Sequence, residues 1–557
     1  MWIETKSQLE NAVQSAVQTA MDDGELTLNS LPEISIERPR EDAHGDAATS
    51  AALSLAREAK MNPRVIAEIV VKRIEPGGAV EKIEIAGAGF INFWLSSAWR
   101  EQALRQVLSE GAEYGRSSRY AGQTALVEFV SANPTGPLTL GHGRQAVIGD
   151  VIARLMEAVG YDVTREYYFN DAGRQMRVLG ESTRARYLEL LNLPAEFPED
   201  GYQGEYIRDI ARELIAEEGD RLAGEEDVAP FRAAAVERIF EQIRATLKRI
   251  GIVFDVYFSE QTLYERGLIE DVVEELRAAG CAYDKDGAVW FRSTAFGLPQ
   301  DRPIIRSGPD REPTYRLPDI AYHREKIRRG YDRIVDILGA DHIDAYPDVF
   351  AGVQALGCDI SCMKALIHQF VTIERDGETV KMSTRRANFD TLDDLLDEVG
   401  EDAVRLFMIH RNMNSHLNFD IDLVKKASND NPVYYLQYAH ARAASLFRQA
   451  RERGVAEPGV DNADLSLLKE REETDLIKRC AYFPAAVMSA AELFEPHSIP
   501  HMLRELAAAF HLFYDRRRIL NPAEPALTEA RLLLVKAVQT TMANGLSLLG
   551  ARAPNQM

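Results

Sequence analysis

The sequence predicts a multidomain α/β protein, and three stretches of the chain indicate this. Residues 125–130 form an apolar strand, which is followed by a loop rich in Pro and Gly, a helix at about 142–159 and a second strand at 163–169. Such a βαβ unit is typical of a parallel sheet with a right-handed crossover. Strand and helix patterns mix before residue 115, whereas the pattern beyond about 390 is helical to the end of the chain. We therefore expect a Rossmann-like parallel-sheet domain, with an α+β domain before it and an all-α bundle after it.

The α+β domain is predicted to cover residues 1–115. Apolar residues at helical spacing predict helices at about 5–21, 46–60 and 63–74. Residues 82–95 are predicted to form two short strands, because Gly87 and Gly89 interrupt an apolar pattern. These elements would make a small unit that buries a core of its own.

The parallel-sheet domain begins with the βαβ unit, whose helix is predicted to end at Gly160. A strongly helical, acidic insertion follows at about 180–255. Later strands are expected at 333–338 and 366–375. The Asp376-Gly377 pair then signals a hairpin. The predicted boundaries are 116–380 for this domain, 381–430 for a basic loop with connecting helices, and 431–557 for the bundle.

Composition and charge limit the classes of protein to which the chain can belong. Hydrophobic residues make up 46%, and no apolar run approaches the roughly eighteen residues that a membrane span needs. The N-terminus lacks the pattern of a signal peptide and four cysteines give no disulfide framework, so we expect a cytoplasmic protein. The net charge of -22 argues against indiscriminate coating of DNA or RNA. No metal site is expected, because no second Cys or His pair accompanies Cys358 and Cys362.

Local basic clusters can still bind nucleic acid in an acidic protein, because affinity depends on local charge. Taken singly, each cluster in this chain is more simply interpreted as a solvated helix face. The clusters are Arg324, Lys326, Arg328 and Arg329; Lys381, Arg385 and Arg386; and Arg516, Arg517 and Arg518.

A first candidate motif, Gly141-His142-Gly143, lies where the first helix of the parallel-sheet domain begins. The N-terminus of a helix offers free backbone N–H groups and the positive end of the helix dipole, which suits phosphate. Gly141 lets a nucleotide approach the backbone closely. His142 can donate a hydrogen bond to charge that develops on an α-phosphate. On its own the motif is weak, because a single His at a helix start is more often a cap or a surface residue.

A second candidate motif, Lys381-Met382-Ser383, lies on the basic loop. A mobile ammonium group there suits a pyrophosphate leaving group, whose charge appears only as the bond breaks. The alternative is an ordinary exposed lysine. Thr391 and Asp394 resemble a capping box for a helix at 392–398.

Taken together and in this order, the two motifs resemble the HIGH and KMSKS signatures of class I aminoacyl-tRNA synthetases. Longer stretches are similar to the arginyl-tRNA synthetases in particular, over nearly the whole chain. These stretches are PREDAHGDAATSAALSLA (39–56), VEFVSANPTGPLTLGHGRQAVIGDVIARLMEAVGYDV (127–163), REYYFNDAGRQM (165–176), FDVYFSE (254–260), YRLPDIAYH (315–323), RGYDRIVDILGADH (329–342), KMSTRRANFDTLDDLLDEVG (381–400), SNDNPVYYLQYAHAR (428–442) and the C-terminal NGLSLLGARAPNQM.

The resemblance implies a role for particular residues. Tyr315, Asp319 and Glu260 would hold a guanidinium group, which is planar and always charged and therefore suits carboxylates. The α-amino and carboxylate end of arginine would be positioned by Glu128, Ser131, Asn133 and His342. ATP would be bound by Thr139, Gly141, His142, Gly339, Asp341, Lys381 and Met382. The catalytic residues would be Thr139, His142, Lys381 and Ser383.

The chain departs from the family signatures at two positions. Thr139 stands where the first His of HIGH is expected, and its hydroxyl can donate a hydrogen bond but cannot carry charge. Thr384 stands in place of the second lysine of KMSKS, followed by Arg385. These changes are the only support for the alternative, a tRNA-binding paralogue without catalysis.

The function implied by the resemblance is that of an arginine–tRNA ligase. ATP would activate L-arginine to arginyl-adenylate, and the arginyl group would then move to the 3'-terminal ribose of arginine tRNA. The resemblance further implies that tRNA binds before activation, that Mg²⁺ arrives with ATP, that the N-terminal domain contacts tRNA, and that the protein is a cytoplasmic monomer with neither a DNA nor a membrane partner. The anticodon would be read in the bundle, where the candidates are Tyr434, Tyr435, Gln437 and Tyr438.

Overall fold

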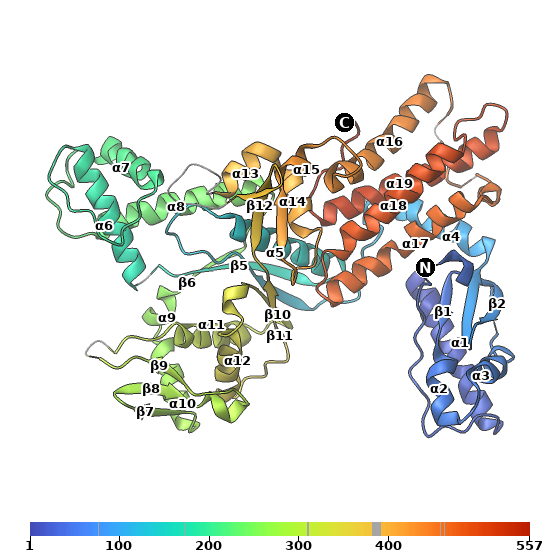
Figure 1. Cartoon of the computed structure of the whole chain (residues 1–557), viewed down its shortest axis with the longest axis horizontal. Coiled ribbons are helices and arrows are strands. Elements are labelled where there is room, and N and C mark those ends of the chain that lie inside the picture. Colours follow the sequence, from blue (N-terminus) through green and yellow to red (C-terminus); the bar gives the residue numbers. More distant parts are fainter. Residues whose placement is uncertain are drawn as a thin grey trace.

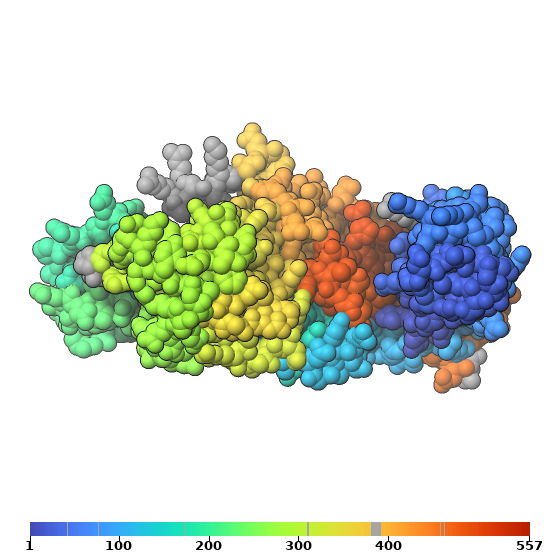
Figure 2. Space-filling view, turned by 90° about the horizontal axis from the view of Figure 1, so that it is seen from below, coloured from blue at the N-terminus to red at the C-terminus, as the bar shows by residue number. Residues whose placement is uncertain are grey.

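The computed structural model of the chain describes all residues except 40, 76, 172, 309–310, 381–390, 457 and 462. The described part forms a central parallel sheet with attachments at both ends (Figure 1). The N-terminal domain and the helical insertion lie at opposite ends of the molecule, as both overall views show (Figures 1 and 2). No helix in the described part is long and apolar enough to cross a membrane.

The N-terminal domain is a three-stranded antiparallel sheet, in the order β1-β3-β2, with helices packed on it. The expected helix at 46–60 is wrong in its first turn, because Ala47–Thr49 pairs with β3 as an edge strand and the helix begins only at Ala51. Pairing with a neighbouring strand outweighs the helix propensity of this Ala-rich stretch. The elements are α1 (Trp2–Asp22), β1 (Ala47–Thr49), α2 (Ala51–Ala59), α3 (Pro63–Val71), β2 (Val80–Ala86), β3 (Phe90–Leu95) and α4 (Ser97–Glu110), which leads out of the domain.

The central sheet has five parallel strands in the order β11-β10-β4-β5-β6. The chain runs outward from β4 in one direction through β5 and β6, then returns to add β10 and β11 on the other side. The order therefore reverses between β4 and β10, and ligands bind at such a switch point, outside the carboxyl ends of the strands. The strands are β4 (Thr124–Glu128), β5 (Asp162–Phe169), β6 (Val256–Ser259), β10 (Arg333–Gly339) and β11 (Met363–His368).

Helices and a separate lobe fill the connections of this sheet. The expected βαβ unit is present, with α5 (Leu140–Ala158) between β4 and β5. The insertion between β5 and β6 projects at the left of Figure 1. It consists of α6 (Gly173–Leu190), α7 (Glu205–Glu218) and α8 (Ala229–Arg249). The lobe after β6 contains α9 (Gln261–Glu265), α10 (Leu268–Ala278), the antiparallel strands β7 (Ala282–Lys285), β8 (Ala288–Phe291) and β9 (Arg302–Ile305), then α11 (Arg316–Arg328) and α12 (Tyr346–Ala355).

The strand expected at 366–375 is two strands in different sheets, so this prediction is wrong. β11 ends at His368 and β12 (Val371–Arg375) begins after a bend. Buried Arg144 stabilises the bend, because its guanidinium donates hydrogen bonds to the carbonyls of Gln369 (2.6 Å) and Phe370 (3.4 Å). A residue 225 positions earlier in the chain thus breaks the apolar run, which no local pattern can reveal. β12 pairs with β13 (Glu378–Val380) and β14 (Leu417–Asp420).

The expected hairpin after β12 is confirmed, because Asp376 and Gly377 both have positive φ, at 52° and 76°. The capping box is confirmed too: the Thr391 side chain accepts a hydrogen bond from the backbone of Asp394 (3.1 Å) at the start of α13. Among the described residues beyond 390, the regular elements are helices joined by loops, with β14 as the one strand. The helices are α13 (Leu392–Val399), α14 (Glu401–Ile409), α15 (Ile421–Lys425), α16 (Pro432–Glu452), α17 (Arg471–Glu492), α18 (Ser498–Arg516) and α19 (Pro525–Leu548).

The hydrophobic cores do not follow the predicted domains one by one. A single continuous core runs through the N-terminal domain, the sheet and the C-terminal helices. A second core joins the α9–α12 lobe to strands β4, β10 and β11, and a third lies within the insertion. Figure 2 shows the lobe and the N-terminal domain as separate masses, with the C-terminal helices between them. The central helix α5 is therefore held on a continuous framework, while the lobe packs against strands β4, β10 and β11 through a core of its own.

Candidate functional site

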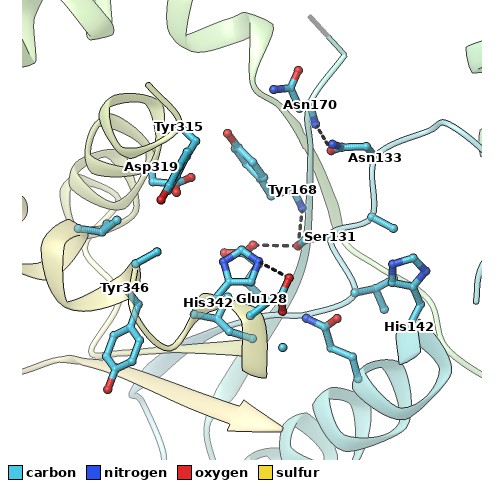
Figure 3. Close-up of a pocket in the computed structure, with 18 of the residues that line it drawn as sticks. Glu128, Ser131, Asn133, His142, Tyr168, Asn170, Tyr315, Asp319, His342 and Tyr346 are labelled. Carbon is cyan, nitrogen blue, oxygen red and sulfur yellow. Dashed lines mark hydrogen bonds and ion pairs between the residues drawn. The ribbon is translucent and has the colours of Figure 1, made fainter. Parts of the chain in front are cut away.

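A cavity of about 540 Å³ opens at the carboxyl ends of the parallel strands, at the switch point between β4 and β10. Tyr315 and Asp319 face Tyr168 across it, and His142 lies at the start of α5 on the far side (Figure 3). The predicted Lys381, Met382 and Ser383, together with Thr384 and Arg385, lie outside the described residues. All the other predicted ATP- and arginine-site residues line this cavity: Glu128, Ser131, Asn133, Thr139, Gly141, His142, Glu260, Tyr315, Asp319, Gly339, Asp341 and His342.

Several lining residues were not predicted from the sequence. Tyr168 and Asn170 stand at the end of β5, where side chains from neighbouring parallel strands gather, and the strand prediction at 163–169 could have pointed to them. His368 is the last residue of β11 and Phe370 lies in the bend after it, a chain break that the prediction of one long strand concealed. The remaining lining residues not predicted are Val130, Ala132, Gln145, Tyr322, His323, Leu338, Ala345, Tyr346, Val349 and Phe350.

One half of the cavity is built around the start of α5. The backbone N–H of Thr139 donates a hydrogen bond to Nδ1 of His142 (3.2 Å), so His142 caps its own helix. Nδ1 acts as the acceptor, which places the proton of the neutral imidazole on Nε2. Burial lowers the pKa of His142 and favours this neutral form. His142 thus offers a neutral N–H donor beside the free amides of the helix start.

The glycines near this helix start have different physical roles. A Cβ added at Gly141 would meet only the Thr139 hydroxyl, at 3.8 Å, so the backbone there faces open space. A Cβ at Gly143 would lie 2.7 Å from the side chain of Leu392, so this glycine permits close packing of α5 against α13. Gly141 is therefore the one that leaves room for a ligand.

The other half of the cavity carries carboxylates. Glu260 accepts hydrogen bonds from the Tyr168 hydroxyl (2.5 Å) and the Asn170 side-chain amide (2.8 Å). Burial raises the pKa of Glu260 to about 7 and that of Asp319 to about 6. No Lys, Arg or His in the described part of the chain forms an ion pair with either one. Tyr315, one turn before Asp319 on α11, is 57% exposed.

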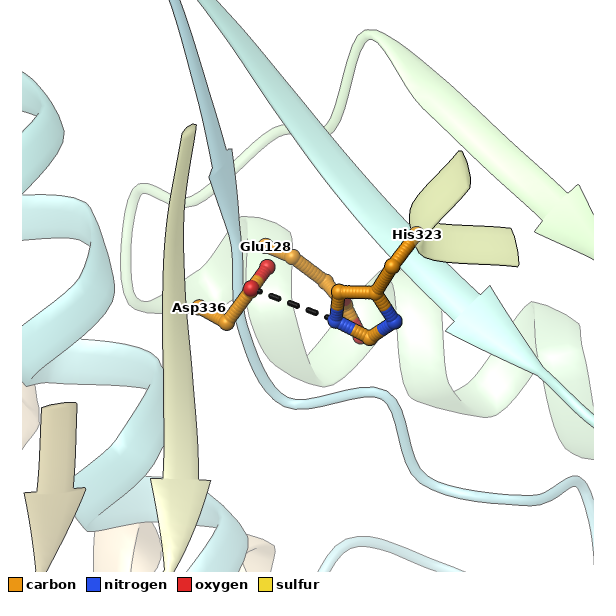
Figure 4. A group of neighbouring side chains, drawn as sticks. All are labelled: Glu128, His323 and Asp336. Carbon is orange, nitrogen blue, oxygen red and sulfur yellow. Dashed lines mark ion pairs between the residues drawn. The ribbon is translucent and has the colours of Figure 1, made fainter. Parts of the chain in front are cut away.

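A second pair of carboxylates, Glu128 and Asp336, shares one buried cation. The buried Lys326 ammonium contacts Glu128 and lies 2.6 Å from Asp336, and the Ser131 hydroxyl donates to Glu128 (2.8 Å). His323 lies 3.3 Å from Asp336 (Figure 4). Although burial disfavours the charged carboxylate, the Lys326 ammonium lowers the pKa of Asp336 well below its usual range. We call Glu128, Asp336 and Lys326 the buried triad.

The triad corrects the interpretation of one basic cluster as a solvated helix face. Lys326 and Arg324 are buried to within 1% of complete, because Lys326 reaches Glu128 and Asp336 in the sheet and α11 packs against α10. Arg324 reaches Glu275 of α10 at 2.7 Å. In the C-terminal cluster, Arg516 and Arg517 both reach Glu472, at 3.1 and 2.8 Å.

The anticodon candidates lie near the start of α16. Tyr434 and Tyr438 are half-buried and stack with their ring centroids 5.4 Å apart. Tyr435 packs edge-on against His511. Gln437 is buried, and its amide donates to Asp402 (2.9 Å) and to the carbonyl of Arg552 (3.1 Å). This burial does not fit base reading and gives Gln437 a role in joining α16 to α14 and the C-terminal segment.

Family models match the chain in succession. They are the arginyl-tRNA synthetase N-terminal domain over residues 7–95, the class I (R) tRNA synthetase catalytic domain over 103–443, and the DALR anticodon-binding domain over 436–557. An arginine–tRNA ligase of Desulfotalea psychrophila is 50% identical over 553 residues, or 99% of this chain and 100% of that relative. One of Salinibacter ruber is 47% identical over 545 residues, or 94% and 96% of the two chains.

Solved structures share the fold. The arginyl-tRNA synthetase of Thermus thermophilus matches with a TM-score of 0.77 at 22% identity, over 99% of this chain and 100% of that one. A methionyl-tRNA synthetase of Mycobacterium tuberculosis matches with a TM-score of 0.55 at 14% identity, over 77% and 91% of the two chains. The domain order, the cavity at the switch point and the full-length relatives agree, and this chain belongs to the arginyl-tRNA synthetase family, whose catalytic domain is of class I.

Proposed function

We propose that the chain is an arginine–tRNA ligase that binds arginine in the acidic half of its cavity and ATP at the start of α5. The observation that carries this assignment is the pair Glu260 and Asp319. Both carboxylates face the cavity without an ion-pair partner among the described residues, and burial raises the pKa of each. A guanidinium keeps its charge at any working pH and supplies the missing cation.

Two elements of the fold supply the acids proposed to bind the guanidinium. Asp319 lies on α11 and Glu260 directly follows β6, and burial together with the nearby Asp319 charge raises the pKa of Glu260. The exposed ring of Tyr315 stands beside Asp319 and suits contact with a planar cation. At the other end of arginine, we assign the α-amino and carboxylate groups to Glu128, Ser131, Asn133 and His342.

ATP would lie with its phosphates at the start of α5, near Thr139, Gly141 and His142, and its ribose near Gly339 and Asp341. In the first step, the carboxylate of arginine attacks the α-phosphate, and pyrophosphate leaves. The neutral Nε2–H of His142 would stabilise the charge that develops on the phosphate. No protein nucleophile takes part, so catalysis depends on positioning and charge stabilisation. We assign the leaving pyrophosphate to Lys381 and Ser383, with Met382 at the nucleotide.

The described residues do not favour a metal site built by the protein. Glu128, His323 and Asp336 lie close enough together to hold an ion, but the Lys326 ammonium already contacts both carboxylates. A second cation there would face strong repulsion. We infer that Mg²⁺ arrives with ATP, bound mainly by the phosphates.

In the second step, the arginyl group moves to the terminal ribose of arginine tRNA. We propose that the stacked Tyr434 and Tyr438, with Tyr435, contact anticodon bases, since exposed aromatic faces stack on single-stranded bases. The N-terminal domain would contact the tRNA elsewhere. We further propose that activation requires bound tRNA, and that the enzyme is a cytoplasmic monomer.

The test is ATP–pyrophosphate exchange with each amino acid in turn, with and without total tRNA. We expect exchange with arginine alone, and only when tRNA is present. Absence of exchange with every amino acid, despite measurable tRNA binding, would sink the catalytic assignment and favour a tRNA-binding protein in which Thr139 and Thr384 mark a decayed site.

A further inference from the structure

The end of β11 places two side chains in the cavity that the mechanism above does not use. His368 is 5% exposed and lines the cavity, yet its Nε2 has no hydrogen-bond partner among the described residues. Strand pairing sets His368 beside Gly339 at the end of β10, and a Cβ added at Gly339 would lie 4.0 Å from that Nε2. A buried polar atom without a partner is costly, so such an atom on a side chain that lines a cavity indicates a ligand contact.

The hydrogen bonding of His368 decides what its free nitrogen can do. Nδ1 lies 3.2 Å from the carbonyl oxygen of Gln369, which can only accept, so Nδ1 carries the proton. Burial lowers the pKa of His368 to about 4, which keeps the ring neutral. Nε2 therefore carries an unused lone pair on a side chain that lines the cavity, and a ligand there can supply the missing donor.

Phe370 stands two residues further along and also lines the cavity, with 59% of its surface exposed. The backbone between these side chains is already used in the scaffold. Arg144 binds the carbonyls of residues 369 and 370, and the amide of Gln369 donates to Met413 (2.9 Å). At this edge of the cavity, the side chains of His368 and Phe370 rather than the backbone are therefore available to bind a ligand.

Of the parts of ATP, only the base matches the apolar ring of Phe370 next to the acceptor Nε2 of His368. The phosphates are acceptors themselves, and the Asp341 carboxylate beside Gly339 already suits the ribose hydroxyls. Adenine is flat, stacks on aromatic rings and carries an amine donor at its edge. We propose that Phe370 stacks on adenine and that His368 Nε2 accepts a hydrogen bond from its 6-amino group. This assignment rests on ATP binding in this cavity. Guanine carries an acceptor at that position, so His368 selects ATP against GTP.

The experiment compares two substrates in two proteins. The substrates are ATP and purine riboside triphosphate, which lacks the 6-amino group, and the assay is arginine-dependent pyrophosphate exchange with tRNA present. We expect the wild-type enzyme to prefer ATP about tenfold in kcat/KM, as for loss of one buried hydrogen bond. His368→Leu should bring the two substrates to within about twofold of each other, because the partner of the amine is gone. If His368→Leu keeps the tenfold preference, the proposal is overturned.

Two further variants separate recognition from damage to the fold. Phe370→Leu should lower kcat/KM for both substrates by the same factor and leave the preference for ATP, which carries the 6-amino group, unchanged. His368→Gln places an amide oxygen near the position of Nε2 and should restore part of that preference. An unchanged KM for arginine shows that the variants are folded.

A third comparison tests the ribose as the source of the donor. If His368→Leu instead abolishes discrimination against 2'-deoxy- or 3'-deoxy-ATP, the adenine assignment is wrong. A wild-type protein without any arginine-dependent exchange would contradict the proposed function itself, which is a different result.

Discussion

Two sets of carboxylates lie near the ends of the same parallel strands, and their surroundings differ. Glu128 and Asp336 belong to the buried triad, where the Lys326 ammonium contacts both. Glu260 and Asp319 face the cavity and form no ion pair with any described residue. The pKa of Asp336 lies below its usual range, whereas those of Glu260 and Asp319 are raised. The difference lies in what balances the negative charge: Lys326 already does so for Glu128 and Asp336, even though Glu128 also lines the cavity, whereas Glu260 and Asp319 are prepared for a cationic ligand.

Helix α11 connects the two sets. Asp319 and Lys326 are seven residues apart, which is close to two helical turns, so they share one face of the helix. His323 lies between them and reaches Asp336. The same helix face thus supplies the free acid of the cavity and the cation beneath it, and substitutions on α11 can separate their roles.

Removal of the cation should have the largest effect on the scaffold. We expect Lys326→Met to lower the free energy of unfolding by about 3–5 kcal/mol, because Glu128 and Asp336 would remain buried without the ammonium group that neutralises them. Urea denaturation measures this change. The matched control is Lys248→Met on the exposed side of α8, which should stay within about 0.5 kcal/mol. Equal stability of the two variants would show that the triad contributes nothing.

Removal of one of the cavity acids that lack an ion-pair partner should instead weaken the binding of arginine. We expect Asp319→Asn to raise the KM for arginine about 100-fold, as expected when a charge-assisted hydrogen bond of about 3 kcal/mol is lost. Its free energy of unfolding should not fall, because no described cation is left unpaired. Asp344→Asn, at an exposed position near the cavity mouth, is the control. A loss of stability without a change in the KM for arginine would place Asp319 in the scaffold.

The pH dependence of arginine binding should sharpen the comparison further. Glu260 and Asp319 titrate near pH 7 and 6, and their protonated forms cannot pair with a guanidinium. Affinity should be full above about pH 8 and fall about twentyfold by pH 6, because arginine must then displace a proton from Glu260 and, in about half of the molecules, from Asp319 as well. Calorimetric titration with arginine and tRNA measures this. Glu260→Gln should bind more weakly and lose the step near pH 7; persistence of that step would assign it to another group.

In the nucleotide half of the cavity, ATP binding should be sensitive to the volume of a side chain rather than to its charge. A methyl group at Gly141 projects into the cavity, so Gly141→Ala should raise the KM for ATP about fivefold and leave that for arginine unchanged. Pyrophosphate exchange at varied ATP measures it. Gly224→Ala, in a loop of the insertion where a Cβ also meets nothing within 4 Å, is the control. An unchanged KM for ATP would move the nucleotide away from the start of α5.

Local patterns in the sequence determined the βαβ unit, the capping box at Thr391 and the hairpin at Asp376-Gly377. These depend on residues close together in the chain, whose spacing fixes helix, strand or turn. The resemblance to a family pointed to the cavity residues, and all the described ones do line one cavity. That they bind arginine and ATP remains a proposal.

Only the tertiary structure decided which charges meet. From the sequence, Lys326 is interpreted as part of a solvated basic cluster, yet it contacts Glu128, 198 residues away in the chain. Arg144 bends an apolar run that a sequence pattern predicts as one strand. His368 becomes an unpaired acceptor because β11 ends beside β10. Such pairings depend on which strands and helices become neighbours, and sequence spacing carries no record of contacts between distant residues.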